Sequence, residues 1–280
     1  MMIDEKVLKN LIQPRPLKSH KGTFGRALLI GGLYPYGGAI IMAALATVNS
    51  GAGLVTVASA PANIPALHSH LPEAMAFDLA DQALLTQQIH SSHVILIGPG
   101  LGDSPLAQKS LDLVLSQVQA NQTLIIDGSA LDLLAKKDQI SWPTQKIVLT
   151  PHQKEWERLS GIEISQQNQE NAREALAHFP SQAILVTKSH QTTIYDQTGQ
   201  VAQLTVGGPY QATGGMGDTL AGMITGFVAQ FREDLFKSVA GASYLHSAIA
   251  DDLAQDAYVV LPTRISQEIP SWMKKMSEED

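Results

Sequence analysis

Cysteine is absent from the 280-residue sequence, which excludes disulfides, thiol catalysis and zinc–thiolate sites within this chain. No cluster of lysine and arginine occurs, and the net charge of −7 gives no electrostatic footprint for nucleic acid. The N-terminal stretch MMIDEKVLKNLIQPRP has acidic side chains and no apolar core, unlike a signal peptide. No apolar run reaches membrane-spanning length. We therefore expect a soluble, cytoplasmic protein whose partners are small molecules, with neither nucleic acid nor membrane among them.

What the chain does contain is an ordinary globular composition, with 44% hydrophobic and 16% charged residues. Short apolar runs without alternation predict buried strands at 27–30, 54–58, 94–97, 124–126, 147–149 and 183–186. Helices are expected at 40–49, 106–118, 153–159, 165–179 and 237–254, with a short helix within residues 1–20. A hairpin is expected at 192–195 and 201–206, and a polar tail at the C-terminus.

Unalternating strands joined by helices indicate a mostly parallel sheet that is covered on both faces. No fixed repeat, low-complexity segment or composition break marks a linker. The fold class predicted from the sequence is therefore α/β, with one doubly wound domain over residues 1–280.

A glycine-rich loop runs directly into a helix between Gly207 and Phe231. The loop lacks the Gly-Lys-Ser/Thr ending of a P-loop, so any phosphate would be held in another way. Helix N-termini carry free N–H groups and a positive dipole end, which suits an anion. Asp218 sits at the start of this helix, where it could accept a proton or merely cap the helix. Because several glycines surround it, we favour an oxyanion hole with an adjacent base.

Polar or glycine residues follow most of the expected strands, which brings them to one edge of a parallel sheet. They are Gly31, the glycines at 98, 100 and 102, Asp127, His152, Lys188 and the segment 214–218. Open α/β sheets bind ligands beyond the carboxyl ends of their strands. The site is expected at this edge.

Five motifs in this order resemble the ADP/ATP-dependent NAD(P)H-hydrate dehydratases of the ribokinase-like superfamily. They are Lys-Gly-Thr-Phe-Gly at 21–25, Gly-Ala-Gly-Leu-Val at 51–55, Gly-Pro-Gly-Leu-Gly at 98–102, Leu-Thr-Pro-His at 149–152 with Glu155, and Ala-Thr-Gly-Gly-Met-Gly-Asp at 212–218. Gly-Xaa-Gly-Asp marks only the superfamily, whereas Thr-Pro-His-Xaa-Xaa-Glu with the Lys-Gly-Xaa-Phe-Gly entry narrows the resemblance to the dehydratases. The epimerase domain that some relatives carry is not expected here.

The resemblance implies repair of hydrated NADH or NADPH, in which ADP or ATP phosphorylates the ring hydroxyl and phosphate is then lost. It assigns Asp218 as the base, with the N–H groups of Gly215, Met216 and Gly217 stabilising charge. It places the substrate against Ala39, Gly102, His152 and Asp218, and the nucleotide against Lys188, Ser189, His190, Gln191, Thr192 and Gly217. Magnesium and a homo-oligomer, with a tetramer favoured, are expected by the same resemblance.

Several simpler interpretations compete for individual residues. Lys188 could be a solvated loop lysine, and His152 could be a helix cap at the surface. Asp127 could help to organise magnesium or only orient its loop. His246 and Tyr244 are expected to pack within a helix rather than bind a ligand.

Two other functions remain open from the sequence. A kinase of the same superfamily, acting on a vitamin precursor alcohol, would share Gly-Xaa-Gly-Asp but would not need Thr-Pro-His-Xaa-Xaa-Glu. A non-catalytic nucleotide sensor would keep the fold and bind ADP, but it would have no need of the carboxylate of Asp218.

Overall fold

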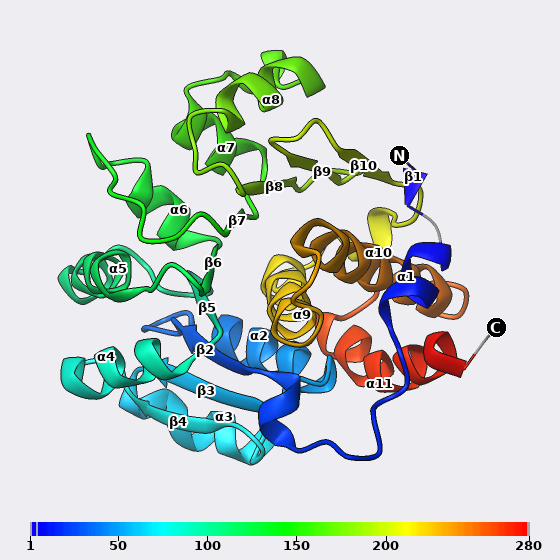
Figure 1. The fold of residues 1–280 in the computed structure, drawn as a ribbon, viewed down its shortest axis with the longest axis horizontal. Helices are drawn as coiled ribbons and strands as arrows, with labels where there is room; N and C mark the ends of the chain where they lie inside the picture. Colours follow the sequence, from blue (N-terminus) through cyan, green and yellow to red (C-terminus); the bar gives the residue numbers. More distant parts are fainter. Residues whose placement is uncertain (1, 4, 279–280) are drawn as a thin grey trace.

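A sheet of ten strands runs through the protein in the computed structural model, which describes residues 2–3 and 5–278 (Figure 1). Its order is β1-β10-β9-β8-β7-β6-β5-β2-β3-β4. The strands are β1 (Met2–Ile3), β2 (Arg26–Ile30), β3 (Leu54–Ser59), β4 (Met75–Asp78), β5 (Val94–Ile97), β6 (Thr123–Ile126), β7 (Ile147–Leu149), β8 (Ile184–Thr187), β9 (Thr193–Asp196) and β10 (Val201–Leu204). All neighbours from β8 to β4 are parallel, and β9 pairs antiparallel with both β8 and β10. The mostly parallel, doubly wound sheet is confirmed.

Two hydrophobic cores lie on opposite faces of this sheet because side chains alternate along each strand. In β2, Leu29 enters one core while Leu28 and Ile30 enter the other. The first core is covered by α1 (Glu5–Leu11), α2 (Gly37–Asn49), α3 (Ile64–His70), α9 (Met216–Gln230), α10 (Leu235–Leu253) and α11 (Pro262–Glu278). The second is covered by α4 (Gln82–Ser91), α5 (Pro105–Gln117), α6 (Ser129–Leu134), α7 (Gln153–Ser160) and α8 (Gln169–Leu176). Figure 1 shows α2, α9, α10 and α11 inside the curve of the sheet and α4 to α8 outside it.

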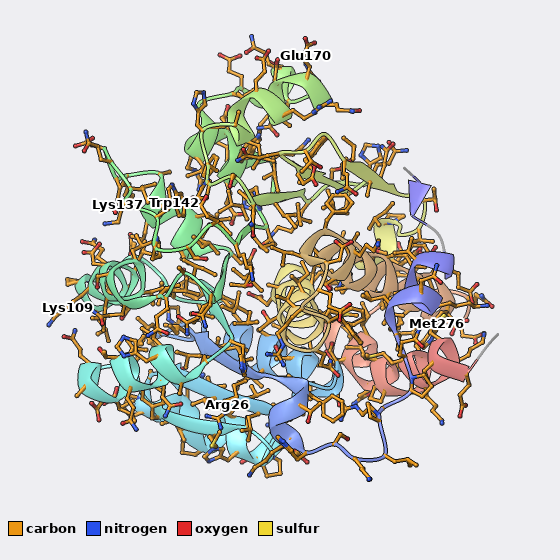
Figure 2. The ribbon with its side chains drawn as sticks, in the orientation of Figure 1. Arg26, Lys109, Lys137, Trp142, Glu170 and Met276 are labelled. Atoms are coloured by element: carbon orange, nitrogen blue, oxygen red, sulfur yellow. The ribbon has the colours of Figure 1, made fainter. Side chains whose placement is uncertain are left out.

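Side chains fill the space between the sheet and both helix layers, and charged residues such as Lys109 and Glu170 lie on the outer surface (Figure 2). Helix α9 is the most enclosed element near the site, with every residue from Thr219 to Ala229 buried. Gly222 permits its close packing on α2, since a Cβ there would lie 2.2 Å from the carbonyl oxygen of Ala43. This packing holds the N-terminus of α9 at the carboxyl edge of the sheet.

Some sequence expectations were wrong in detail. The expected C-terminal polar tail is α11, which buries Ile265, Ile269 and Met276 on one face. The expected helix at 165–179 is shorter: Asn168 caps α8, and a separate turn of 3₁₀ helix precedes it at Ile164–Gln166. Strand β4 and helices α3, α4 and α6 were not anticipated. No helix in the described part of the chain is long and apolar enough to span a membrane.

Candidate active site

The carboxyl ends of the central strands meet at one edge of the sheet. Strand pairing aligns Ile97 with Ile126 and Ile126 with Leu149, so the residues that follow these strands become neighbours. Asp127 follows β6, Thr150 follows β7 and Lys188 follows β8. An isolated parallel bridge between His152 and Lys188 extends the β7–β8 pairing past the strands. The expected edge is therefore the place where the candidate residues gather.

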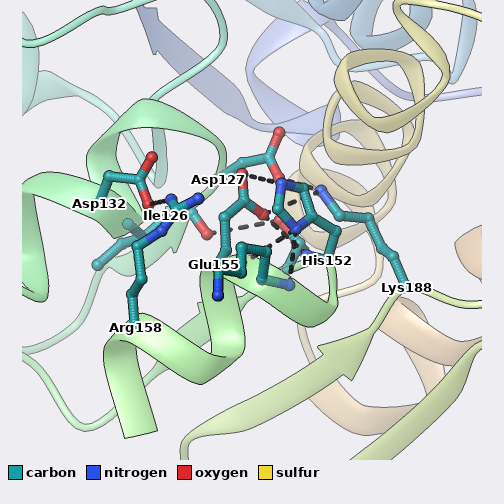
Figure 3. Close-up of polar contacts among 9 residues, drawn as sticks. Ile126, Asp127, Asp132, His152, Glu155, Arg158 and Lys188 are labelled. Atoms are coloured by element: carbon teal, nitrogen blue, oxygen red, sulfur yellow. Dashed lines mark hydrogen bonds and ion pairs between the residues drawn. The ribbon is translucent and has the colours of Figure 1, made fainter. Parts of the chain in front are cut away.

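A lysine and two carboxylates form a charged cluster at this edge (Figure 3). The Nζ atom of Lys188 donates to Oδ1 of Asp127 at 2.7 Å and lies 4.0 Å from Oε2 of Glu155. The hydroxyl of Thr150 donates to the same Oδ1 atom of Asp127 at 2.7 Å. The Lys188 side chain is 19% exposed, and that of Asp127 only 3%. Lys188 is thus a partnered lysine, and its interpretation as a solvated loop residue is wrong.

The N-terminus of α7 is closed by a capping box between His152 and Glu155. Nδ1 of His152 accepts hydrogen bonds from the backbone N–H groups of Lys154 and Glu155, at 3.0 and 3.1 Å. Oε2 of Glu155 accepts from the N–H of His152 at 2.8 Å. The helix-cap interpretation of His152 is confirmed. Its ring is still half exposed, with Nε2 3.4 Å from Oε1 of Glu155, so its contact with substrate stays a prediction.

The glycine-rich loop leads into the N-terminus of α9, which no side chain caps. Helix α9 begins at Met216 after Gly215, whose φ of 93° is left-handed and favours glycine. No side chain caps the helix, so the alternative that Asp218 is its N-cap is wrong. The N–H groups of Gly215, Met216 and Gly217 make no hydrogen bond to another described residue. They are free to bind an anion.

Lys188 also reaches this turn. A Cβ placed on Gly217 would lie 3.2 Å from the Nζ atom of Lys188, so the ammonium group packs against the first turn of α9. The free N–H groups and the lysine therefore face one region from two different elements. Such an arrangement can stabilise the negative charge of a phosphoryl group during its transfer.

Two carboxylates of the site, Asp218 and Glu155, have raised pKa values. Burial, followed by the charge of Asp127, raises the pKa of Asp218 to about 6, and Lys188 only partly offsets this. Burial also raises the pKa of Glu155. Burial would lower the pKa of Lys188, but Asp127 and Glu155 outweigh it and raise that pKa, so the ammonium stays charged. A carboxylate with a pKa near 6 is suited to act as a general base near neutral pH.

A cavity of about 610 Å³ adjoins this cluster on the α10 side. Its wall includes Lys188, Ser189, His190, Thr192 and Gly217, which are five of the six residues expected to bind the nucleotide. Gln191 lines a neighbouring hollow together with His152. His246 lies in the cavity wall and is 4% exposed, in agreement with its expected packing role.

The expected substrate residues Ala39 and Gly102 lie on the other half of the edge, near β2 and β5. Ala39 is in the first turn of α2, and a Cβ on Gly100 would lie 3.0 Å from its Cβ. Gly102 has a left-handed φ of 69°, and a Cβ added there would meet no atom within 4 Å. Met42, one turn after Ala39, packs against the position of Gly215, which connects this half to the glycine loop.

The pairing of Asp127 with Thr150 and Lys188 is the feature that the sequence did not reveal. Asp127 was noted only as a possible magnesium ligand or loop residue, and Thr150 only as part of a motif. The available signal was the shared position of all three after adjacent parallel strands. Within residues 2–3 and 5–278, no group of three or more histidine or acidic side chains could hold a metal ion.

Comparison with known proteins agrees with this geometry. An Enterococcus faecalis structure, described as a ribokinase-like superfamily protein, is 48% identical over 99% of this chain and 96% of its own, with a TM-score of 0.96. The fold is therefore ribokinase-like, and in this chain it presents an uncapped helix N-terminus with a carboxylate, Asp218, in its first turn.

The family model for NAD(P)H-hydrate dehydratase matches residues 27–271, and this chain belongs to that family. An ADP-dependent (S)-NAD(P)H-hydrate dehydratase from Streptococcus thermophilus is 60% identical over 99% of this chain and all of its own. The Bacillus subtilis ADP/ATP-dependent enzyme, co-crystallised with ATP and Mg²⁺, is 30% identical with a TM-score of 0.87 and 98% of each chain covered.

Proposed function

We propose that the protein is a nucleotide-dependent NAD(P)H-hydrate dehydratase that uses ADP as its phosphoryl donor. The observation that carries the proposal is the half-buried carboxylate of Asp218 beside three free N–H groups and the ammonium of Lys188. Family membership supplies the substrate class, and the 60% identical relative from Streptococcus thermophilus is ADP-dependent.

The reaction needs a poor leaving group to be made into a good one. Asp218 takes the proton from the ring hydroxyl of the hydrated dinucleotide, and the hydroxyl oxygen attacks the terminal phosphorus of ADP, which releases AMP. The lone pair of the ring nitrogen then expels phosphate, and loss of a proton from the adjacent carbon restores the double bond. In phosphoryl transfer most of the acceleration comes from positioning and electrostatics.

Each part of the site has a task in this scheme. The N–H groups of Gly215, Met216 and Gly217 bind the oxygens of the transferred phosphoryl group, with Lys188 beside them. Asp127 holds the lysine in place. Residues 188–192 and the adjoining cavity bind the nucleotide, while Ala39, Gly102 and His152 bind the dinucleotide on the opposite side. The cavity next to Gly217 supports this division.

Magnesium fits the site if it binds together with the nucleotide phosphates rather than to protein ligands alone. Mg²⁺ is commonly held by one or two carboxylates together with substrate phosphates, so a cage of three protein ligands is not needed. Asp127 and Glu155 are the carboxylates closest to Lys188, and either could orient water around such an ion. Bound Mg²⁺ would neutralise phosphate charge.

Absorbance provides the test. Purified protein is mixed with ADP and hydrated NADH, and the near-ultraviolet absorbance of the dihydronicotinamide is followed. The proposal predicts recovery of absorbance that depends on ADP. If the absorbance does not recover and the protein instead phosphorylates a free vitamin precursor alcohol, the kinase alternative is correct. Sedimentation velocity checks the expected homo-oligomer in the same sample.

A further inference from the structure

The loop between β2 and α2 carries two tyrosines whose rings are open to solvent. Tyr34 is 94% exposed and Tyr36 is 57% exposed. Neither ring makes an aromatic, cation–π or hydrogen-bond contact with another described residue. Aromatic rings have a large apolar surface that favours burial, so exposed rings beside a binding site are candidates for ligand contact.

The backbone of Tyr36, by contrast, is firmly placed. Its N–H donates to the carbonyl of Leu33 at 2.7 Å, and its own carbonyl accepts from the N–H of Ala39 at 3.2 Å. Gly100 packs directly on it, since a Cβ there would lie 2.3 Å from the carbonyl oxygen of Tyr36. Tyr36 is therefore held between two segments expected to contact the substrate. Because the backbone is already fixed, covering the ring orders only the two side-chain torsions of tyrosine, which costs little conformational entropy.

Tyr36 lies at the start of α2, whereas the residue of α2 that packs against the glycine loop is one to two turns farther into the helix. Met42 packs against Gly215, and Tyr36 precedes Met42 by six residues at the start of the same helix. At about 1.5 Å per residue, Tyr36 lies roughly 9 Å farther along the helix axis. A dinucleotide whose nicotinamide ring is at Asp218 and which runs past Ala39 toward the start of α2 would bring its adenosine half toward Tyr36.

We propose that Tyr36 stacks against the adenine ring of the hydrated dinucleotide. The inference rests on the proposed function. Adenine is fully aromatic, whereas the hydrated nicotinamide ring has saturated carbons and is not planar. Only the adenine end offers a complete π-face, and stacking of a base on an aromatic side chain is tolerant of small changes in geometry. In the proposed function the phosphoryl donor occupies the cavity next to Gly217, whose wall does not include Tyr36, so the base of the donor should not depend on Tyr36.

The experiment compares variants of Tyr36 on a complete and on a truncated substrate. Values of kcat/KM are measured for hydrated NADH and for hydrated reduced nicotinamide mononucleotide, which lacks the adenosine half. Tyr36→Ala is expected to lower kcat/KM about tenfold for the dinucleotide, mainly through KM, and to leave the mononucleotide unchanged. Tyr36→Phe keeps the ring and should retain activity. Tyr36→Leu keeps apolar bulk without a π-face and should behave like Tyr36→Ala.

Affinity for ADP, measured by calorimetry, should be the same in all variants and serves as the control for folding. Equal losses for both substrates, or no loss for the dinucleotide, would overturn the role of Tyr36. If the unaltered protein fails to convert either hydrated substrate, the proposed function itself is wrong.

Discussion

The two halves of the carboxyl edge of the sheet differ in the residues that form them. After β6, β7 and β8 the chain supplies charged and hydroxyl side chains, which form the Asp127–Thr150–Lys188 cluster. After β2 and β5 it supplies glycines, and the backbone forms the surface. A Cβ on Gly31 would lie 2.0 Å from the carbonyl oxygen of Pro99, and one on Gly98 would lie 1.7 Å from that of Asp127.

The contrast matches what each half is proposed to bind. Phosphoryl transfer needs fixed charge next to the reacting atoms, which the lysine and the helix N-terminus provide. A large dinucleotide needs a close-fitting wall, and glycine lets backbone segments approach one another and the ligand. Charge is thus concentrated in the half proposed to bind the nucleotide, whereas the half proposed to bind the dinucleotide consists mainly of closely packed backbone.

The largest effect is expected at the carboxylate between the two halves. Asp218→Asn keeps the size of the side chain but removes its ability to accept a proton. We expect kcat to fall on the order of 10³-fold, the range usual for a general base. Steady-state kinetics measure the loss. Asp132→Asn is the control, since Asp132 is paired with Arg158 away from the glycine loop. If Asp218→Asn turns over nearly as fast as the control variant, Asp218 is not the general base.

The charged half can be tested by a double-mutant cycle. Lys188→Met leaves the carboxylate of Asp127 buried without its cation, and such changes cost about 3 kcal/mol of unfolding free energy. Adding Asp127→Asn to Lys188→Met should restore much of the stability but none of the activity. Urea unfolding and kinetics separate the two effects. Additive stability losses would show that the pair is not coupled.

The glycine half should respond to shape alone. Gly98→Ala should cost about 3 kcal/mol of unfolding free energy, because φ is 132° and its Cβ would clash with the backbone of Asp127. Gly102→Ala is the matched comparison, since its φ is also left-handed but no atom lies within 4 Å of the added Cβ. It should cost only about 1 kcal/mol. Equal costs measured by urea unfolding would contradict the account of close packing at Gly98.

The smallest effect is a shift in pH dependence. Asp218 must be deprotonated to act as a base, so kcat should fall as the pH drops through about 6. Asp127 is a negative neighbour that raises this pKa. Asp127→Asn should therefore move the midpoint to lower pH. Thr150→Val removes a hydrogen bond to Asp127 but leaves the Asp127 carboxylate charged. It should leave the midpoint of the pH profile nearly unchanged. A midpoint that moves upward in Asp127→Asn would contradict the electrostatic account.

The sequence predicted the elements that have strong local signals. Apolar runs at 27–30 and 94–97 identified buried strands, and the glycine loop before Asp218 identified the start of α9. It missed α11 because only a few apolar residues, including Ile265 and Ile269, mark its buried face. The four-residue spacing of Ile265 and Ile269 is the local signal of that face.

The site was predicted less completely, for a physical reason. The predicted end of a strand indicates which residues reach the carboxyl edge of the sheet. It does not indicate which of their side chains contact one another. Asp127 and Lys188 are 61 positions apart, and their contact depends on the register of three strands. Similarly, the capping role of His152 could be read locally, whereas the contact of Lys188 with Gly217 required the packing of α9 against the sheet.

The most direct test follows the oxygen atom of the ring hydroxyl. Hydrated NADH is prepared with ¹⁸O in that hydroxyl and converted by the protein with ADP, and the phosphate released is analysed by mass spectrometry. If Asp218 activates the hydroxyl for phosphorylation before elimination, the phosphate carries the ¹⁸O label. Unlabelled phosphate, with the ¹⁸O recovered in water, would contradict the account.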